Sequence, residues 1–124
     1  MYAAVAAGGA TGAMLRYGVS QLVGAGIFGV AGPLATIIVN ILGSGLMGVF
    51  AGAVAAGLIL PEAWRGFLTV GLLGALTTFS SFALDAGNLM QKQGMAMAAS
   101  YVAASILLSL AAFAVCFFVM RGAQ

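Results

Sequence analysis

The chain has 124 residues, of which 64% are hydrophobic and 5% are charged, and its net charge is +2. A typical globular protein carries roughly 25% charged residues, so the composition excludes an ordinary soluble domain and favours a protein whose surface faces lipid. The basic residues are scattered, which argues against a nucleic-acid-binding surface. With no histidine, one cysteine and no pair of acids suited to catalysis, an enzyme is not expected.

Four apolar segments follow one another along the chain. Each has about the 20 residues that a helix needs to cross the core of a bilayer, and they cover roughly residues 2–23, 34–58, 64–89 and 95–120. A Gly- and Pro-rich stretch from Gly24 to Pro33 separates the first two. No basic residue precedes the first apolar stretch, so we expect it to be kept as a span and not cleaved as a signal peptide. The sequence therefore predicts one all-α membrane domain, residues 1–124, with four transmembrane helices.

Glycine pairs in the first two segments indicate how these helices pack. Gly8 and Gly12 have the GxxxG spacing, and so do Gly48 and Gly52. In lipid, such small residues let helix backbones approach closely. We expect both pairs to lie at helix–helix contacts.

The basic residues are balanced between the two ends of the predicted bundle. Arg65 and Arg121 lie on the side of the termini, and Arg16 and Lys92 lie toward the other side. Orientation in a membrane normally follows an excess of Lys and Arg on the cytoplasmic side, and here there is none. The balance favours insertion in both orientations, which would allow an antiparallel dimer, unless the charges are too few to decide orientation. Charge counting leaves both interpretations open.

Two polar stripes run along the second and fourth spans. Residues four apart share one face of a helix, and the stripes are Thr36, Asn40 and Ser44, and Tyr101, Ser105 and Ser109. The Asn40 amide is costly in lipid, so it must face a partner or a pore. Hydroxyls that bond back to their own helix, and an Asn40 that joins two helices, are the structural alternative.

The third span contains the segment GLLGALTTFSSF at residues 71–82. Its glycines, followed by β-branched and hydroxyl residues, favour a break near the middle of the helix, where freed carbonyl groups can bind a cation. Phe79 and Phe82 lie among four hydroxyl residues. Hydroxyl and amide hydrogens donate to anions, and aromatic ring edges are positive. The residue types therefore indicate an anion pathway.

Ionisable residues limit the alternatives. Arg16 is the one clear candidate deep within a span, and such residues are functional suspects. Glu62 and Asp85 are expected near segment ends, so no mid-span carboxylate is predicted. A small dual-topology multidrug/proton antiporter would need such an acid. A structural membrane protein, in which the polar stripes join helices, is the other alternative.

Three segments resemble the Fluc (CrcB) family of fluoride channels. They are GGATGAMLRYGVS at residues 8–20, GPLATIIVNILGSGLMG at 32–48, and the 71–82 segment. The resemblance covers all four spans. It implies a passive, fluoride-selective channel in the bacterial inner (cell) membrane, which exports cytoplasmic fluoride and so lowers its toxicity. It also implies an antiparallel, dual-topology homodimer.

The resemblance further implies roles for individual residues. The fluoride pore would be lined by Phe79, Phe82, Asn40, Ser80, Tyr101, Ser105, Ser109 and Thr36. Arg16 would attract anions near an aqueous vestibule, and backbone carbonyls of Gly74 and Thr77 would hold a structural sodium ion at the dimer centre. The family commonly has Thr at the position of Ser81, and this exchange keeps the hydroxyl.

Overall fold

The computed structural model describes residues 1–24 and 31–123, and this part of the protein is mostly helical, with no strand. This confirms the predicted all-α class. The helices in chain order are α1 (Tyr2–Gly24), α2 (Ala31–Ala55), α3 (Glu62–Arg65), the π-helix η1 (Gly66–Leu73), α4 (Gly74–Leu76), α5 (Phe79–Gln93) and α6 (Met95–Gly122). The elements α3, η1, α4 and α5 together form the predicted third segment.

Several boundaries differ from the predicted ones by a few residues. Gly32 and Pro33 belong to the first turn of α2 and not to the connection before it. Proline is tolerated there because the first N–H groups of a helix have no intrahelical partner. Gly24 ends α1, and the predicted turn glycines Gly26 and Gly29 lie outside the described residues.

Three segments of the described chain are long and apolar enough to cross a membrane, namely Gly32–Ala55, Glu62–Gln93 and Met95–Gly122. The chain is therefore a multi-pass membrane protein. Helix α1 has 23 residues but carries Arg16 and several polar side chains, and it is not among the three. A fourth span in α1 stays a prediction.

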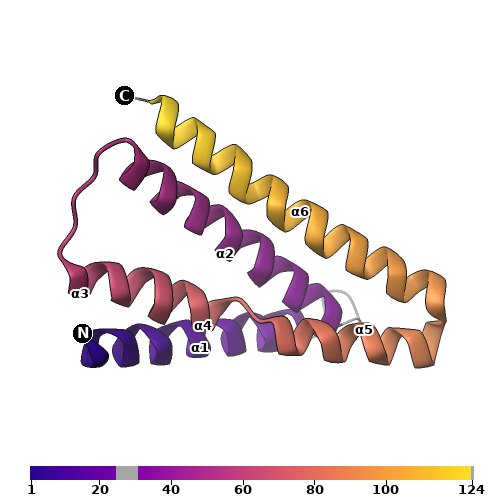
Figure 1. The fold of residues 1–124 in the computed structure, drawn as a ribbon. Helices are drawn as coiled ribbons and strands as arrows, with labels where there is room; N and C mark the ends of the chain where they lie inside the picture. Colours follow the sequence, from indigo (N-terminus) through magenta and orange to yellow (C-terminus); the bar gives the residue numbers. More distant parts are fainter. Residues whose placement is uncertain (25–30, 124) are drawn as a thin grey trace.

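Two helix pairs make up the fold (Figure 1). Helix α1 lies along η1 and α4, and α2 lies along α6, while α5 contacts both α2 and α6. Both termini and the connection between α2 and α3 lie toward one end, and the turn between α5 and α6 lies at the other (Figure 1). This arrangement matches the predicted placement of the termini.

The GxxxG glycines lie at the closest contacts between helices, as predicted. A Cβ atom on Gly8 would overlap the carbonyl oxygen of Phe67 in η1, and one on Gly48 would overlap that of Phe113 in α6. Gly12 and Gly52 meet the same two partner helices one turn further on. Backbone-to-backbone packing of this kind stabilises helices where water exclusion between them contributes little.

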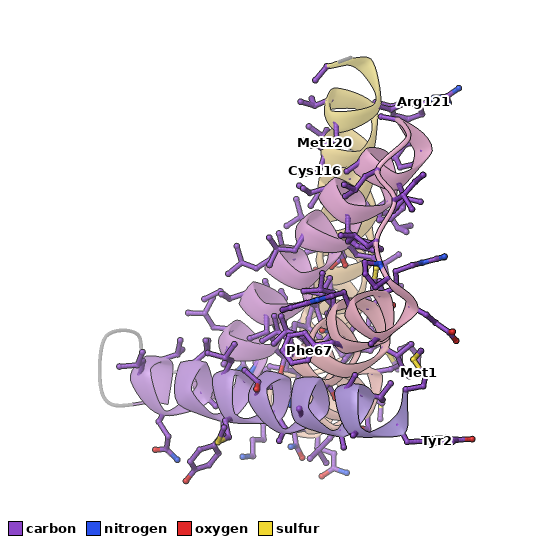
Figure 2. The ribbon with its side chains drawn as sticks, turned by 90° about the vertical axis from the view of Figure 1, so that its left-hand side faces the viewer. Met1, Tyr2, Phe67, Cys116, Met120 and Arg121 are labelled. Carbon is purple, nitrogen blue, oxygen red and sulfur yellow. The ribbon has the colours of Figure 1, made fainter. Side chains whose placement is uncertain are left out.

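Large apolar side chains cover much of the outside (Figure 2). They include Leu107, Leu110 and Val119 of α6, each of them more than 60% exposed. Arg121 points away from the protein at the end of α6 (Figure 2). An apolar exterior of this extent suits contact with lipid or with another membrane-embedded chain.

The third segment is broken in its middle. Helix α4 ends at Leu76 and α5 begins at Phe79, and the two residues between them, Thr77 and Thr78, have extended backbone angles (ψ of 154° and 125°). The predicted break is therefore present. The eight π-helical residues of η1 just before it were not predicted. Short π-helical stretches are rare and are frequent at functional sites.

Candidate functional site

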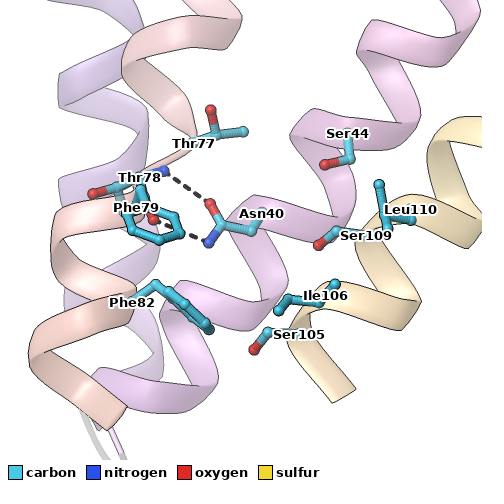
Figure 3. A pocket seen from close by; sticks show the side chains of 10 residues that line it. All are labelled: Asn40, Ser44, Thr77, Thr78, Phe79, Phe82, Ser105, Ile106, Ser109 and Leu110. Carbon is cyan, nitrogen blue, oxygen red and sulfur yellow. Dashed lines mark hydrogen bonds between the residues drawn. The ribbon is translucent and has the colours of Figure 1, made fainter. Parts of the chain in front are cut away.

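An open cavity of about 330 Å³ lies beside the break, between α2, α5 and α6 (Figure 3). Five of the predicted pore residues line it: Asn40, Phe79, Phe82, Ser105 and Ser109. The remaining lining residues are Ser44, Thr77, Thr78, Ile106 and Leu110. The cavity thus brings together polar groups from three separate helices, as the two stripes and the hydroxyl cluster predicted.

Asn40 is paired with the backbone of the break. Its Nδ2 donates to the carbonyl oxygen of Thr78 at 3.1 Å, and the N–H of Thr78 donates to its Oδ1 at 2.8 Å (Figure 3). An amide nitrogen carries two hydrogens, and this pairing uses one of them. Asn40 therefore contacts a neighbouring segment and also keeps one hydrogen that it can donate within the cavity.

The two threonines of the break cap the helix ends on either side of it. Thr77 Oγ1 donates to the carbonyl oxygen of Leu73 at 2.9 Å, at the end of α4. Thr78 Oγ1 accepts from the backbone N–H of Ser81 at 3.2 Å, as an N-cap of α5. Ser80 is exposed, and its hydroxyl lies 3.2 Å from that of Thr78. Much of the hydroxyl cluster therefore stabilises the break, and Ser80 is not among the cavity-lining residues.

Ser105 and Ser109 contribute two buried hydroxyls on α6. Neither oxygen has a hydrogen-bond partner within the described ranges, and Ser105 is only 4% exposed. A buried donor without a partner costs free energy, and such groups are rare in folded proteins. Both serines line the cavity, and no described residue accepts or donates a hydrogen bond at their hydroxyls.

Three aromatic rings stand in a row beside these hydroxyls. The ring centroids of Phe79 and Phe82 are 5.4 Å apart, and those of Phe82 and Tyr101 are 5.6 Å apart with a 27° angle between the planes. Tyr101 therefore covers one face of the Phe82 ring. Phe82 is buried, whereas Phe79 is 79% exposed. Aromatic rings carry partial negative charge on their faces and partial positive charge at their edges.

Asp85 occupies a different environment from the one predicted. Because α5 continues to Gln93, Asp85 lies two turns inside the helix and not near the end of the segment. It is 9% exposed, and its Oδ2 accepts from Thr36 Oγ1 at 2.6 Å and from the Tyr101 hydroxyl at 3.3 Å. Thr36 and Tyr101 are thus bonded to Asp85 and are not among the cavity-lining residues.

The sequence contained a signal for this carboxylate. Asp85 follows Phe82 by three residues, which places both on one face of a helix. The expected end of the third span, at residue 89, lies four residues before the end of α5 at Gln93, and so it places Asp85 near the end of the span. Ser44 was part of the second-span stripe, but only the structure places it at the cavity.

The remaining predicted site residues lie elsewhere. Arg16 is half-buried in α1 and is not among the cavity-lining residues. Thr77 lines the cavity, whereas Gly74 lies in α4. No cluster of His, Cys, Asp or Glu able to hold a metal occurs among the described residues. A cation bound there would have to use other ligands, such as backbone carbonyl oxygens.

Comparisons with known proteins show the family to which the chain belongs. Residues 3–117 match the family model described as CrcB-like protein, Camphor Resistance (CrcB). The chain is 46% identical to a protein of Nitrobacter winogradskyi and 49% identical to one of Rhodospirillum centenum, in each case over 88% of this chain and 86% of the relative. A protein of Saccharophagus degradans is 42% identical over 93% of this chain and 85% of its own length. All three relatives carry the name fluoride-specific ion channel FluC. The chain belongs to the CrcB-like protein family.

Proposed function

We propose that this protein is a passive, fluoride-selective ion channel that exports cytoplasmic fluoride and thereby lowers its toxicity. The observation that carries the proposal is the cavity at the break, where an amide and two phenylalanine rings meet two serine hydroxyls that have no partner in the described part of the chain. The names of the relatives support it, and they describe a channel and not an enzyme. The proton-coupled antiporter gains no support from them.

The chemistry of the cavity suits an anion that is strongly hydrated. Such an ion gives up its water only if other donors replace it. Ser105, Ser109 and the second amide hydrogen of Asn40 can donate to it, and the edges of Phe79 and Phe82 can approach it. None of the cavity-lining residues carries a charge. Neutral donors bind an anion weakly enough to release it again, as conduction requires.

Ser80 extends the proposed pathway beyond the cavity, whereas the single hydroxyl hydrogens of Thr36 and Tyr101 are donated to Asp85 and are not free for an ion. Ser80 lies exposed near Thr78. Arg16 supplies positive charge to attract anions before they enter. The direction of transport follows from acid–base chemistry: neutral hydrogen fluoride crosses the bilayer and ionises in the cytoplasm, and the negative-inside potential drives the anion out through the pore.

The working unit in this proposal is an antiparallel homodimer in the bacterial inner membrane. The balance of basic residues supports insertion in both orientations. The openness of the cavity and the high exposure of Phe79, 79%, also support it. An aromatic side chain beside a polar cavity would be covered if a second copy packed against this face.

A structural sodium ion at the centre of the dimer is compatible with the residues at the break. The last carbonyl groups of a helix have no intrahelical partners, and Gly74 lies in the last turn of α4, with Thr77 extended just after it. Gly74 has no side chain to shield its carbonyl. Sodium prefers oxygen ligands of this kind. Bound there, the ion would supply positive charge that holds two breaks together.

Expression in a bacterium that lacks its own fluoride exporter tests the physiological proposal. Cells that produce the chain should grow in fluoride medium that stops cells carrying an empty vector. The difference should widen as the medium is made more acidic, because more fluoride then enters as the neutral acid. Production of the protein in the membrane without any gain in fluoride tolerance would contradict the proposal.

A further inference from the structure

The break in the third segment leaves backbone N–H and C=O groups without the hydrogen bonds that a continuous helix would have provided. Within a membrane, an unsatisfied backbone N–H or C=O costs several kcal/mol, so the partners of these groups matter. At Thr78, both groups have the same partner, the side chain of Asn40 on α2. Two bonds between one carboxamide and one residue fix the orientation of the backbone as well as its position.

Gly43, a second residue on the same face of α2, packs against Thr77, the other residue of the break. Gly43 follows Asn40 by three positions, so the two are neighbours on the helix surface. A Cβ atom on Gly43 would overlap Cγ2 of Thr77. The absence of a side chain at Gly43 therefore allows α2 to approach the break closely enough for Asn40 to reach Thr78.

We propose that Asn40 is a positioning residue. Together with Gly43 it forms the surface of α2 against which the break packs, here called the break seat. The break seat fixes the positions of Phe79 and Phe82 at the cavity. Phe79 directly follows Thr78 and begins α5, so the orientation of Thr78 sets the start of the helix that carries both rings. Asn40 then acts through the backbone of Thr78 in addition to donating its second hydrogen in the cavity. An effect of these residues on fluoride flux rests on the proposed channel function. The packing of the break against the break seat does not depend on that function.

Hydrogen exchange of the Thr78 amide in lipid nanodiscs tests the bond directly. Asn40→Ala removes the acceptor, and exchange at Thr78 should become about tenfold faster, since a lost hydrogen bond in a buried site has an effect of that order. Ser44→Ala is the matched control, because Ser44 lies one turn further along the same face and no bond joins it to the break. Unchanged exchange at Thr78 in Asn40→Ala would overturn the proposal.

A rescue experiment tests the seat without removing any donor. Gly43→Ala should lower fluoride flux at least several-fold, because the new methyl group displaces Thr77. Adding Thr77→Ser removes the overlapping Cγ2 and keeps the hydroxyl that donates to Leu73, so the double variant should recover most of the flux. Normal flux in Gly43→Ala, or no recovery in the folded double variant, would contradict the seat. Lack of flux in the unaltered protein would instead contradict the channel function, and the exchange experiment would still decide the seat.

Discussion

Thr36 Oγ1 donates to Asp85 Oδ2 across 2.6 Å and so joins α2 to α5 in the buried part of the protein. The hydroxyl of Tyr101 donates to the same oxygen from α6, so one carboxylate links three helices. The carboxylate is therefore a structural centre at one end of the two polar stripes.

Asp85→Ala should lower the melting temperature of the purified protein. The change leaves the Tyr101 hydroxyl buried without this acceptor, at a cost of about 1–3 kcal/mol, whereas Thr36 Oγ1 can still donate to the carbonyl oxygen of Gly32. Asp85→Asn keeps an acceptor oxygen and should lower the melting temperature less. Glu62→Ala is the control, because Glu62 is exposed. An Asp85→Ala variant as stable as Glu62→Ala would contradict this role.

Ser105→Ala and Ser109→Ala should each reduce fluoride flux by about tenfold without lowering the melting temperature. Their hydroxyls have no partner among the described residues, so removing them should not destabilise the fold, whereas losing one donor to a passing ion is worth about 1.4 kcal/mol, or tenfold. Ser100→Ala is the control, because its exposed hydroxyl bonds to its own helix at Ala96. A drop in stability with normal flux would assign the two serines a structural role.

Phe82→Ile should abolish fluoride flux while the protein remains folded and keeps the association state of the unaltered chain. Isoleucine retains the apolar bulk that packs against Tyr101, but it has no positive ring edge. Flux is measured in liposomes, and association by size-exclusion chromatography. Phe118→Ile serves as the control, since Phe118 is 63% exposed on α6 and away from the cavity. Normal flux in Phe82→Ile would remove Phe82 from the pathway.

Gly48→Ala should destabilise the protein, because a Cβ atom there would overlap the backbone carbonyl of Phe113, which cannot move without shifting α6. Overpacking typically costs about 1–3 kcal/mol. Gly87→Ala is a matched control, because a Cβ atom at that position meets nothing within 4 Å. Equal melting temperatures for the two variants would show that α2 and α6 are not packed as closely as described.

A tag at the C-terminus should report equal inside and outside populations in intact cells. The reason is the even distribution of Arg16, Arg65, Lys92 and Arg121, which provides no orientation signal. Labelling with a membrane-impermeant reagent before and after lysis measures the two populations. A second variant with two added lysines after Arg121 should shift the balance between the inside and outside populations. One fixed orientation of the unaltered chain would exclude an antiparallel homodimer.

Much of the polar face of the cavity could be predicted, because helical spacing depends on sequence alone. Asn40 and Ser44, and Ser105 and Ser109, are four residues apart, and the structure places all four at the cavity. The break was also predictable, because residue types at positions 71–82 disfavour a continuous helix. Both features are encoded locally, in residues close together in the sequence.

Features that depend on contacts between distant residues could not be predicted. The hydrogen-bond partner of Asn40 is the backbone of Thr78, 38 residues away. A pattern of side chains in the sequence does not predict a hydrogen bond to a distant backbone group. The burial of Asp85 depends on Thr36, 49 residues away, and on where α5 ends. The π-helical turn at Gly66–Leu73 lies against α1, and no sequence pattern at these residues accounts for it.

Fluoride efflux from liposomes decides whether the protein is a fluoride-selective channel. Liposomes that contain the purified protein are loaded with potassium fluoride, and valinomycin is added so that potassium can carry the compensating charge. Identical liposomes loaded with potassium chloride are the control. Rapid loss of fluoride with retention of chloride is the predicted result. Retention of fluoride by liposomes that contain folded protein, or equal loss of both anions, would contradict a fluoride-selective channel.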